Sequence, residues 1–401
     1  MRKFHINQLP NDRIFVLLNK KFHKELFQKI KNTFSFQRLN KLMGGELTRS
    51  TYKKWFYRLK GNKFNKNPRF IPLWFFTKIS KILPFFDINK IERNILAYKG
   101  PSASTIILKP RFPLNENERI LRIIAHLIGD GHADGAFGTN LPKGKSSSHY
   151  ANTNLDVIKS FRRDLKVFGN FKTNIKIDKV REHRIYKIGV PNLMGYILTH
   201  IYNINFNCLD SRIPKSLYKL GKRNLTNFIK AFADDEGHVF DSSIEFYSAN
   251  LDLIKGLIRL IRLKFPEIKI SSLKINDKVR NNIKYSFSIL ASGLEFYAKS
   301  IGFDHKQKMK DLLFNIKRVK LDNRHNQRLD TKNRLLKELS RNNLTAKQLS
   351  RRYFLRHSYI LKQLNELKKE GKVEIINKDK FSNIWSLKIS SYSNDPNDHL
   401  S

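Results

Sequence analysis

Cysteine is almost absent from this chain, which contains a single one, Cys208. One cysteine excludes an intrachain disulfide and a zinc site built from several cysteines. Acidic side chains are also scarce, since 34 Asp and Glu stand against 78 Lys and Arg and give a net charge of +44. Such an excess attracts a polyanion, and nucleic acid is the expected partner. A basic ribosomal or membrane-surface protein is the alternative that charge alone leaves open.

Long hydrophobic runs are missing as well. The most apolar stretch, Phe70 to Phe86, is interrupted by prolines and lysines and is too short to span a bilayer, so we expect a buried amphipathic helix there. No apolar segment follows Met1, so no signal peptide is visible. We therefore expect no membrane partner and a cytoplasmic location. The hydrophobic fraction of 40% is nevertheless enough for well-packed cores, and the length suggests two or three domains.

A helical domain is predicted for residues 1–100, which are dense in Phe and Lys. Two helices, 36–42 and 48–57, are separated by Gly44-Gly45 and resemble a helix-turn-helix, with 71–83 packed across them. The second helix would present three basic side chains on one face to DNA, since residues three to four apart are neighbours on a helix. These are Lys53, Lys54 and Arg58. A plain three-helix module with solvated lysines is the alternative.

Two stretches in the middle of the chain look like copies of one another. They read IIAHLIGDG at 123–131 and IKAFADDEG at 229–237, so each is an apolar helix that ends in an acidic residue followed by glycine. A single acidic residue before a glycine is common at the end of a helix and needs no functional explanation. Two copies, each opening a similar stretch of chain, favour a functional pair instead.

Further echoes extend the repeat beyond the two helices. Residues 154–159 are similar to 250–255, and the strand-like residues 186–190 are similar to 285–289. The spacing between the copies is nearly constant. The extra residues of the first copy fall in 139–148, which we predict to be a longer hairpin loop. Each half then reads helix, strand pair, helix, strand pair, helix. The sequence thus predicts a pseudo-symmetric, duplicated α+β unit over 113–320, with repeats at about 114–210 and 222–320.

The first motif helix is apolar nearly all round and is expected to be buried, with Asn115 as its N-cap and Glu118 completing a capping box. Small residues at Ala125, Gly129 and Ala231 would let the two motif helices pack closely. Close packing would bring the acidic ends of the helices together.

The two acidic residues at these ends are Asp130 and Glu236. Two carboxylates near helix carboxyl ends repel each other and oppose the helix dipoles, and a divalent cation resolves this conflict. Mg²⁺ takes oxygen ligands and often uses only one or two carboxylates, with phosphate and water completing its shell. Gly131 and Gly237 would let the backbone turn sharply after each acid.

The paired stretches resemble the LAGLIDADG (dodecapeptide, DOD-type) motifs of homing endonucleases in their monomeric, two-motif form. The second copy, 228–237, is the closer match. Other segments also resemble sequences of the family, namely 211–214 and 301–303 with Lys306 and Lys308. The resemblance covers about Leu114 to Lys320, roughly half of the chain. It implies two antiparallel sheets that form a saddle in the major groove of DNA.

The resemblance also implies roles for individual residues. In the family, the acidic residue before the last glycine of each motif binds the catalytic metal, which assigns Asp130 and Glu236 as Mg²⁺ ligands. A strand lysine often assists, and the candidates are Lys187 and Lys284. The histidines that follow each motif, His132 and His238, are equally open to contact with phosphate or a solvent-facing position.

Two residues depart from the family pattern. Asp235 stands where a small residue is usual and could loosen the helix seam, and His126 stands where an apolar residue is usual. A histidine inside an apolar helix is expected to be a hydrogen-bonded core residue rather than a ligand. Neither departure removes a predicted metal ligand.

A winged helix-turn-helix is predicted for 328–389, followed by a disordered tail at 390–401. Thr345 would cap the helix 346–352 and Ser358 would cap a third helix that ends before Gly371, with two strands after it. The third helix would enter a major groove with three side chains outward. These are Tyr359, Lys362 and Gln363. A protein-docking module is the alternative.

A site-specific, Mg²⁺-dependent endonuclease that acts on double-stranded DNA as a monomer is the function these features favour. A catalytically silent DNA-binding regulator and a splicing helper that binds intron RNA are the alternatives that use the same fold. An endonuclease embedded in a self-splicing protein element is not expected, because the chain lacks the terminal nucleophile and the His-Asn pair of such elements.

Overall fold

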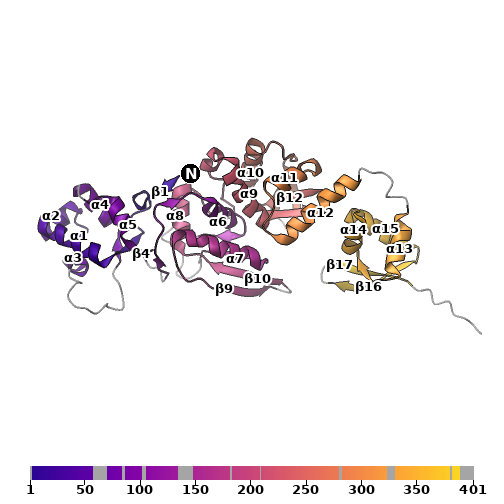
Figure 1. The fold of residues 1–401 in the computed structure, drawn as a ribbon, viewed down its shortest axis with the longest axis horizontal. Helices are drawn as coiled ribbons and strands as arrows, with labels where there is room; N and C mark the ends of the chain where they lie inside the picture. The colour runs from indigo at the N-terminus through magenta and orange to yellow at the C-terminus, as the bar shows by residue number, and fades with distance from the viewer. Residues whose placement is uncertain are drawn as a thin grey trace, which may run out of the picture.

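A computed structural model describes residues 2–56, 70–83, 86–101, 105–133, 148–180, 183–207, 209–279, 282–322, 330–379 and 382–388. The fold is α+β, with helices and several small antiparallel sheets. Figure 1 shows an elongated molecule in which the N-terminal region, the central part and the C-terminal module follow one another along the long axis. Cys208, the predicted 139–148 loop except for Ser148, and the predicted 390–401 tail lie outside the described residues.

The N-terminal region combines helices with a four-stranded sheet. Its helices are α1 (Lys20–Thr33), α2 (Phe36–Leu42), α3 (Arg49–Phe56), α4 (Leu73–Ile82) and α5 (Ile88–Arg93). The sheet has the order β3-β2-β4-β5, from β2 (Phe15–Leu18), β3 (Ile71–Pro72), β4 (Ile95–Lys99) and β5 (Ile107–Leu108). Two further short strands, β1 (Lys3–Phe4) and β6 (Leu114–Asn115), pair with each other. In the chain, β1 comes before the 3-10 turn η1 (Ile6–Gln8) and the helices of this region, and β6 comes after them.

The prediction of a helical N-terminal region was therefore wrong in part. The strands β2 and β4 are mostly apolar and only four and five residues long. Runs of that length carry too few residues to distinguish a strand from a buried helix by period. The predicted pair of helices around Gly44-Gly45 does form, and the Thr48 hydroxyl accepts a hydrogen bond from the Thr51 N–H at 3.1 Å where α3 begins.

The central part consists of two halves with the same element order. The first has α6 (Glu118–Ile128), β7 (Gly131–His132), β8 (His149–Asn152), α7 (Leu155–Asp164), η2 (Leu165–Phe168), β9 (Ile175–Val180), β10 (His183–Gly189) and α8 (Asn192–Tyr202). After η3 (Lys215–Lys219), the second has α9 (Lys222–Glu236), β11 (Gly237–Phe240), β12 (Ser243–Ser248), α10 (Leu251–Lys264), β13 (Lys274–Val279), β14 (Asn282–Ile289), η4 (Ala291–Gly293) and α11 (Leu294–Ser300). The sheets, β7-β8-β10-β9 and β11-β12-β14-β13, share one strand order.

Equivalent asparagines begin α7 and α10. The side chain of Asn154 accepts from the Asp156 N–H at 2.9 Å, and that of Asn250 accepts from the Leu253 N–H at 3.0 Å. The first motif helix was predicted to be capped by Asn115, and this was wrong. Asn115 is paired in β6, and the cap of α6 is Asn117, whose side chain accepts from the N–H groups of the next turn.

Buried side chains of the N-terminal region and of both central halves form one continuous hydrophobic cluster, from Ile6 to Leu312. Contacts such as the hydrogen bond from the Tyr98 hydroxyl to the Phe168 carbonyl, at 3.0 Å, join the N-terminal region to the first half. None of the described helices is long and apolar enough to cross a membrane.

The C-terminal module has a hydrophobic cluster of its own and follows α12 (Lys306–Asp322). Its elements are α13 (Thr331–Leu339), β15 (Leu344–Thr345), α14 (Ala346–Tyr353), α15 (His357–Lys369), β16 (Val373–Asp379) and β17 (Ser382–Leu387), with the sheet order β15-β17-β16. Thr345 caps α14 through a capping box, as predicted. Ser358 is not a cap, because α15 begins one residue before it and its N-cap is Arg356.

Candidate active site

Helices α6 and α9 pack side by side along a seam at the centre of the molecule. Ala125 of α6 and Ala231 of α9 are fully buried. At the carboxyl end of the seam, a Cβ atom placed on Gly129 would lie 3.1 Å from the Cβ of Asp235. The missing side chain at Gly129 therefore lets the two helix ends approach each other closely.

The glycine that follows each acidic residue is required by a close approach of backbone. A Cβ atom on Gly131 would lie 2.5 Å from the Cα of Leu127, and one on Gly237 would lie 2.7 Å from the carbonyl oxygen of Ala233. Any side chain at either position would push the following strand, β7 or β11, away from the helix end. These glycines thus fix the direction in which the chain leaves each acidic residue.

The carboxyl groups of Asp130 and Glu236 interact with each other at this end of the seam. Burial raises the pKa of Glu236 to about 8, and repulsion from Asp130 and Asp235 adds to the rise, while Lys308 and Lys284 oppose it. Desolvation, followed by repulsion from Asp235, raises the pKa of Asp130 to about 7, although the residue as a whole is exposed on the pocket side. The pair therefore holds its protons more tightly than ordinary carboxyl groups, and the nearby lysines offset only part of this effect.

A pocket of about 400 Å³ opens beside Asp130. Its lining combines both halves of the central part and α12, through Asp130, Asn152, Ile185, Asp235, His238 and Lys308. Among the described residues, no three side chains of His, Cys, Asp or Glu are grouped as a metal-binding cluster. The pocket thus offers carboxylate oxygens at one edge and a lysine nearby.

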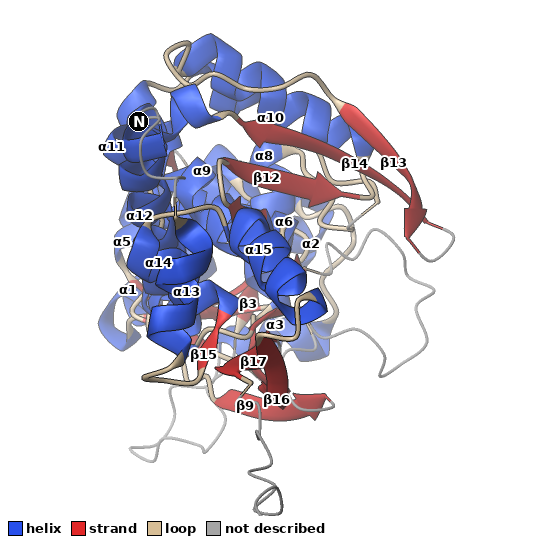
Figure 2. Cartoon of the chain, turned by 90° about the vertical axis from the view of Figure 1, so that its right-hand side faces the viewer, coloured by secondary structure: helices blue, strands red, loops and turns tan. Residues whose placement is uncertain are grey.

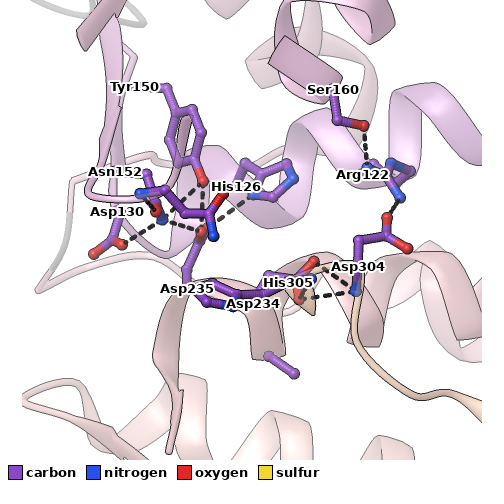
Figure 3. Close-up of polar contacts among 12 residues, drawn as sticks. Arg122, His126, Asp130, Tyr150, Asn152, Ser160, Asp234, Asp235, Asp304 and His305 are labelled. Atoms are coloured by element: carbon purple, nitrogen blue, oxygen red, sulfur yellow. Dashed lines mark hydrogen bonds and ion pairs between the residues drawn. The ribbon is translucent and has the colours of Figure 1, made fainter. Parts of the chain in front are cut away.

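Asp235 does not loosen the seam, because a buried polar cluster surrounds its carboxyl group (Figure 3). His126 Nδ1 lies 2.9 Å from one carboxyl oxygen, and the other accepts from the Tyr150 hydroxyl at 2.5 Å and the Asn152 amide at 3.1 Å. Burial lowers the pKa of His126 to about 4 and raises that of Asp235 to about 8. His126 is therefore a neutral, hydrogen-bonded core residue.

The amide nitrogen of Asn152 connects this cluster to the predicted metal ligands. It lies 3.4 Å from a carboxyl oxygen of Asp130 as well as 3.1 Å from that of Asp235. The backbone N–H of Asp130 also donates to the Asp235 carboxyl group. Asp235, which is adjacent to Glu236 at the end of α9, thus binds the end of α6.

Helix α12 is locked onto the end of α9 by reciprocal contacts. The buried carboxylate of Asp234 accepts from the backbone N–H groups of Asp304 and His305, at 3.1 and 2.9 Å, immediately before α12 begins. In return, Lys308 Nζ donates to the carbonyl oxygens of Ala233 and Asp234, at 3.2 and 2.6 Å. Each helix end thereby receives the charge that its dipole favours.

A buried arginine ties the first half to the same junction. Arg122 of α6 donates to Asp164 of α7 at 2.8 Å and also pairs with Asp304, which precedes α12. Figure 3 shows Arg122 and Ser160 beside Asp304, on the far side of the junction from Tyr150. The acidic ends of the motif helices are thus held from both halves.

Each central sheet has one face covered by helices and one open face. Tyr150 and Ile188 pair in the first sheet, and Phe246 and Phe287 pair in the second, and all four are fully buried. Because side chains alternate along a strand, the intervening residues lie on the open face. The basic side chains on the open faces include His132, His149, Lys176 and Lys187 in the first sheet, and His238, Lys274 and Lys284 in the second. Figure 2 shows β12, β14 and β13 of the second sheet alongside α10.

The two candidate lysines are not equivalent. Register and the matching asparagine caps align Lys284 with Ile185 of the first half, and align Lys187 with Ser286 of the second. The charge of Lys284 acts on Glu236, whereas the matching Ile185 lines the pocket beside Asp130. The site therefore has a lysine on the Glu236 side and an apolar side chain at the equivalent place on the Asp130 side.

The predicted contacts in the terminal modules are only partly on the surface. On α15, Lys362 is exposed, whereas Tyr359 is half-buried and packs against the hydrophobic cluster of the module, so it is only partly outward. The amide of Gln363 donates to Glu366 at 3.3 Å. On α3, Lys54 is exposed, and the Lys53 side chain and Arg58 lie outside the described residues.

Sequence reasoning did not assign roles to Lys308, Tyr150 and Asn152, although all three contact the acidic end of the seam. The two departures from the motif pattern, His126 and Asp235, were the available signal. A polar residue in each of two buried, facing helices can be explained by one contact between them.

No protein-family model matches the sequence, and no curated protein matches it. Among solved structures, the homing endonuclease I-DmoI in complex with DNA and Mn aligns with 47% of this chain and 97% of its own, at 14% identity and TM-score 0.34. The homing endonuclease I-WcaI bound to its DNA recognition sequence aligns with 47% and 81%, at 15% identity and TM-score 0.35. Full-length DUF199/WhiA from Thermatoga maritima aligns with 64% and 92%, at 12% identity and TM-score 0.33. Similarity at this level does not establish a shared function.

Proposed function

We propose that the protein is a divalent-metal-dependent endonuclease that cleaves double-stranded DNA at a specific site, with a duplicated LAGLIDADG-type core and two flanking DNA-binding modules. The observation that carries the proposal is the meeting of Asp130 and Glu236. They occupy matched positions at the ends of two buried helices, and repulsion from Asp130 contributes to the raised pKa of Glu236.

The donor set suits a hard divalent cation such as Mg²⁺. Asp130 and Glu236 supply carboxylate oxygens. Desolvation and repulsion between like charges raise their pKa values, and the nearest lysines lower these values only in part. A site with two carboxylates fits a metal that completes its shell with water and with the phosphates of the substrate. When bound, Mg²⁺ would activate a water molecule and stabilise the leaving oxygen of the phosphodiester.

The surrounding residues have separate tasks in this proposal. Lys284 would place positive charge at the phosphate near Glu236, and the basic side chains of the open sheet faces would hold the backbone of the duplex. The major groove of B-DNA admits β-strands, and base edges can be distinguished there. The net charge of +44 supports a strong and salt-sensitive attraction to DNA.

The flanking modules would extend the contact along the duplex. Helix α15 exposes Lys362 on a module with its own core, and α3 exposes Lys54 at the other end of the molecule. Because Figure 1 places these modules at opposite ends, they would bind DNA on either side of the cleavage site.

The test is the digestion of a randomised plasmid library by the full-length chain, with Mg²⁺ and with EDTA, followed by sequencing of the ends. Ends that share one sequence and appear only with Mg²⁺ support the proposal. Tight binding of duplex DNA without cleavage under Mg²⁺ or Mn²⁺ contradicts it and favours the regulator, and binding restricted to structured RNA favours the splicing helper.

A further inference from the structure

The polar cluster around Asp235 has no counterpart in the second half of the molecule. His126 is matched on α9 by Phe232, and Tyr150 is matched on β12 by Phe246. The two phenylalanine rings stack with centroids 6.3 Å apart. The fold therefore accommodates an apolar arrangement in one half and a hydrogen-bonded one in the other, at matched positions beside the carboxyl end of the seam.

Stability alone does not explain the polar version. Burying a carboxyl group, an imidazole and a phenol removes each from water, and replacement of such a cluster by well-packed apolar residues is often neutral or stabilising. The matching phenylalanines show that this framework holds the apolar alternative in the second half. A buried polar network does, however, fix geometry more narrowly than apolar contacts, because its hydrogen bonds are directional.

The geometry that this cluster fixes is that of the acidic pair. Asp235 is directly before Glu236 in α9, and its carboxyl group binds the backbone N–H of Asp130. Tyr150 holds the same carboxyl group from β8, at 2.5 Å, and His126 holds it from α6, at 2.9 Å. A shift of α9 along α6 would break all of these contacts together.

We propose that His126, Tyr150 and Asp235 are positioning residues that set the separation of the Asp130 and Glu236 carboxylates, and thereby the affinity of the pair for a divalent cation. This inference rests on the proposed function, since it takes the pair as the metal site. Residues that orient metal ligands without touching the metal typically change its affinity about 10- to 100-fold when they are lost.

The test uses the full-length chain and Mn²⁺ alone, with bound Mn²⁺ measured by electron paramagnetic resonance and folding measured by thermal unfolding. The main variant, H126F/Y150F/D235A, replaces the cluster with the matching phenylalanines and a small residue. We expect it to keep a melting temperature close to that of the wild type and to bind Mn²⁺ at least about 10-fold more weakly. Thr199→Val, which alters a buried hydroxyl of α8 outside the cluster, should leave Mn²⁺ affinity unchanged.

Unchanged Mn²⁺ affinity in the folded triple variant would overturn the inference while leaving the proposed function intact. If the triple variant does not fold, Tyr150→Phe decides, because it removes one hydroxyl and keeps the ring; affinity equal to that of the wild type would again overturn it. A wild-type chain that binds no Mn²⁺, with or without duplex DNA, would contradict the proposed function itself and the inference with it.

Discussion

Lys284 is a basic side chain of the open face whose charge acts on Glu236. If this charge stabilises the phosphate during cleavage, Lys284→Met should lower kcat about 100-fold with little change in KM, since preorganised charge of this kind acts mainly in the transition state. Single-turnover cleavage of the identified target measures this effect. Lys274→Met, at an exposed position of the edge strand of the same face, serves as the control and should change kcat little.

The raised pKa values of Asp130 and Glu236, about 7 and about 8, make the metal-free protein sensitive to pH. An acid whose pKa is higher in the folded state binds more protons there, so its stabilising effect is lost as pH rises through the folded pKa. The free energy of unfolding in EDTA is expected to fall from pH 6.5 to pH 8. At the lower edge of this window His126 acts in the opposite direction, because its pKa is lowered to about 4 from an ordinary value of 6.5, and this smaller effect fades as pH rises above 6.5.

Thermal unfolding in EDTA across this pH range measures the slope. Asp130→Asn should flatten the slope in part, because Glu236 and Asp235 still titrate. Mn²⁺ should raise the melting temperature more at pH 8 than at pH 6.5, since it binds the ionised carboxylates. A stability that is flat or rises with pH over this window would show that the pair is not desolvated as described.

Duplication made Asp130 and Glu236 recognisable in the sequence, because two acidic helix ends at one spacing are a rare coincidence. Lys308 was noted only within a stretch that resembles the family, and nothing distinguished its role among 78 basic residues. Its position depends on α12 folding back onto the end of α9, a tertiary contact that leaves no local pattern. The pairing of His126 with Asp235 likewise joins residues from different halves.

At the scale of elements, the junction of α9 and α12 depends on Lys308. Lys308→Met removes a half-buried charged donor from carbonyl oxygens of α9 and should lower the free energy of unfolding by about 1–3 kcal/mol. Denaturant unfolding measures the change. Lys306→Met, two residues away, removes an exposed ion pair with Asp156 and should change stability by less than about 0.5 kcal/mol.

Elements with a cap and a long apolar stripe could be predicted, and short ones could not. Thr345 begins α14 with a capping box because its side chain and Gln348 satisfy free N–H groups locally. The strand β6 instead takes Asn115 into a pairing with Lys3, distant in the sequence, so its predicted role as a cap was overruled by a contact that local rules do not contain. The same applies to β2 and β4.

At the scale of the whole molecule, DNA binding should be spread over distant parts of the surface. The C-terminal module has a separate core, and Lys362 is exposed on its α15. Lys362→Met is expected to weaken binding of duplex DNA and to reduce the slope of log Kd against log salt by about 1, as for the loss of one phosphate contact. Fluorescence anisotropy over a salt series measures this. Lys269→Met, an exposed change outside the open sheet faces, should leave the slope unchanged.

The measurement that tests the central claim most directly compares four full-length proteins on the randomised library: wild type, Asp130→Asn, Glu236→Gln and, as control, Asp252→Asn, which removes an exposed carboxylate paired with Arg212. We predict Mg²⁺-dependent cleavage at one sequence by the wild type and the control, and none by the other two variants, with duplex DNA still bound by all four. Cleavage that persists in Asp130→Asn or Glu236→Gln, or a wild type that binds DNA and never cuts it, would contradict the account.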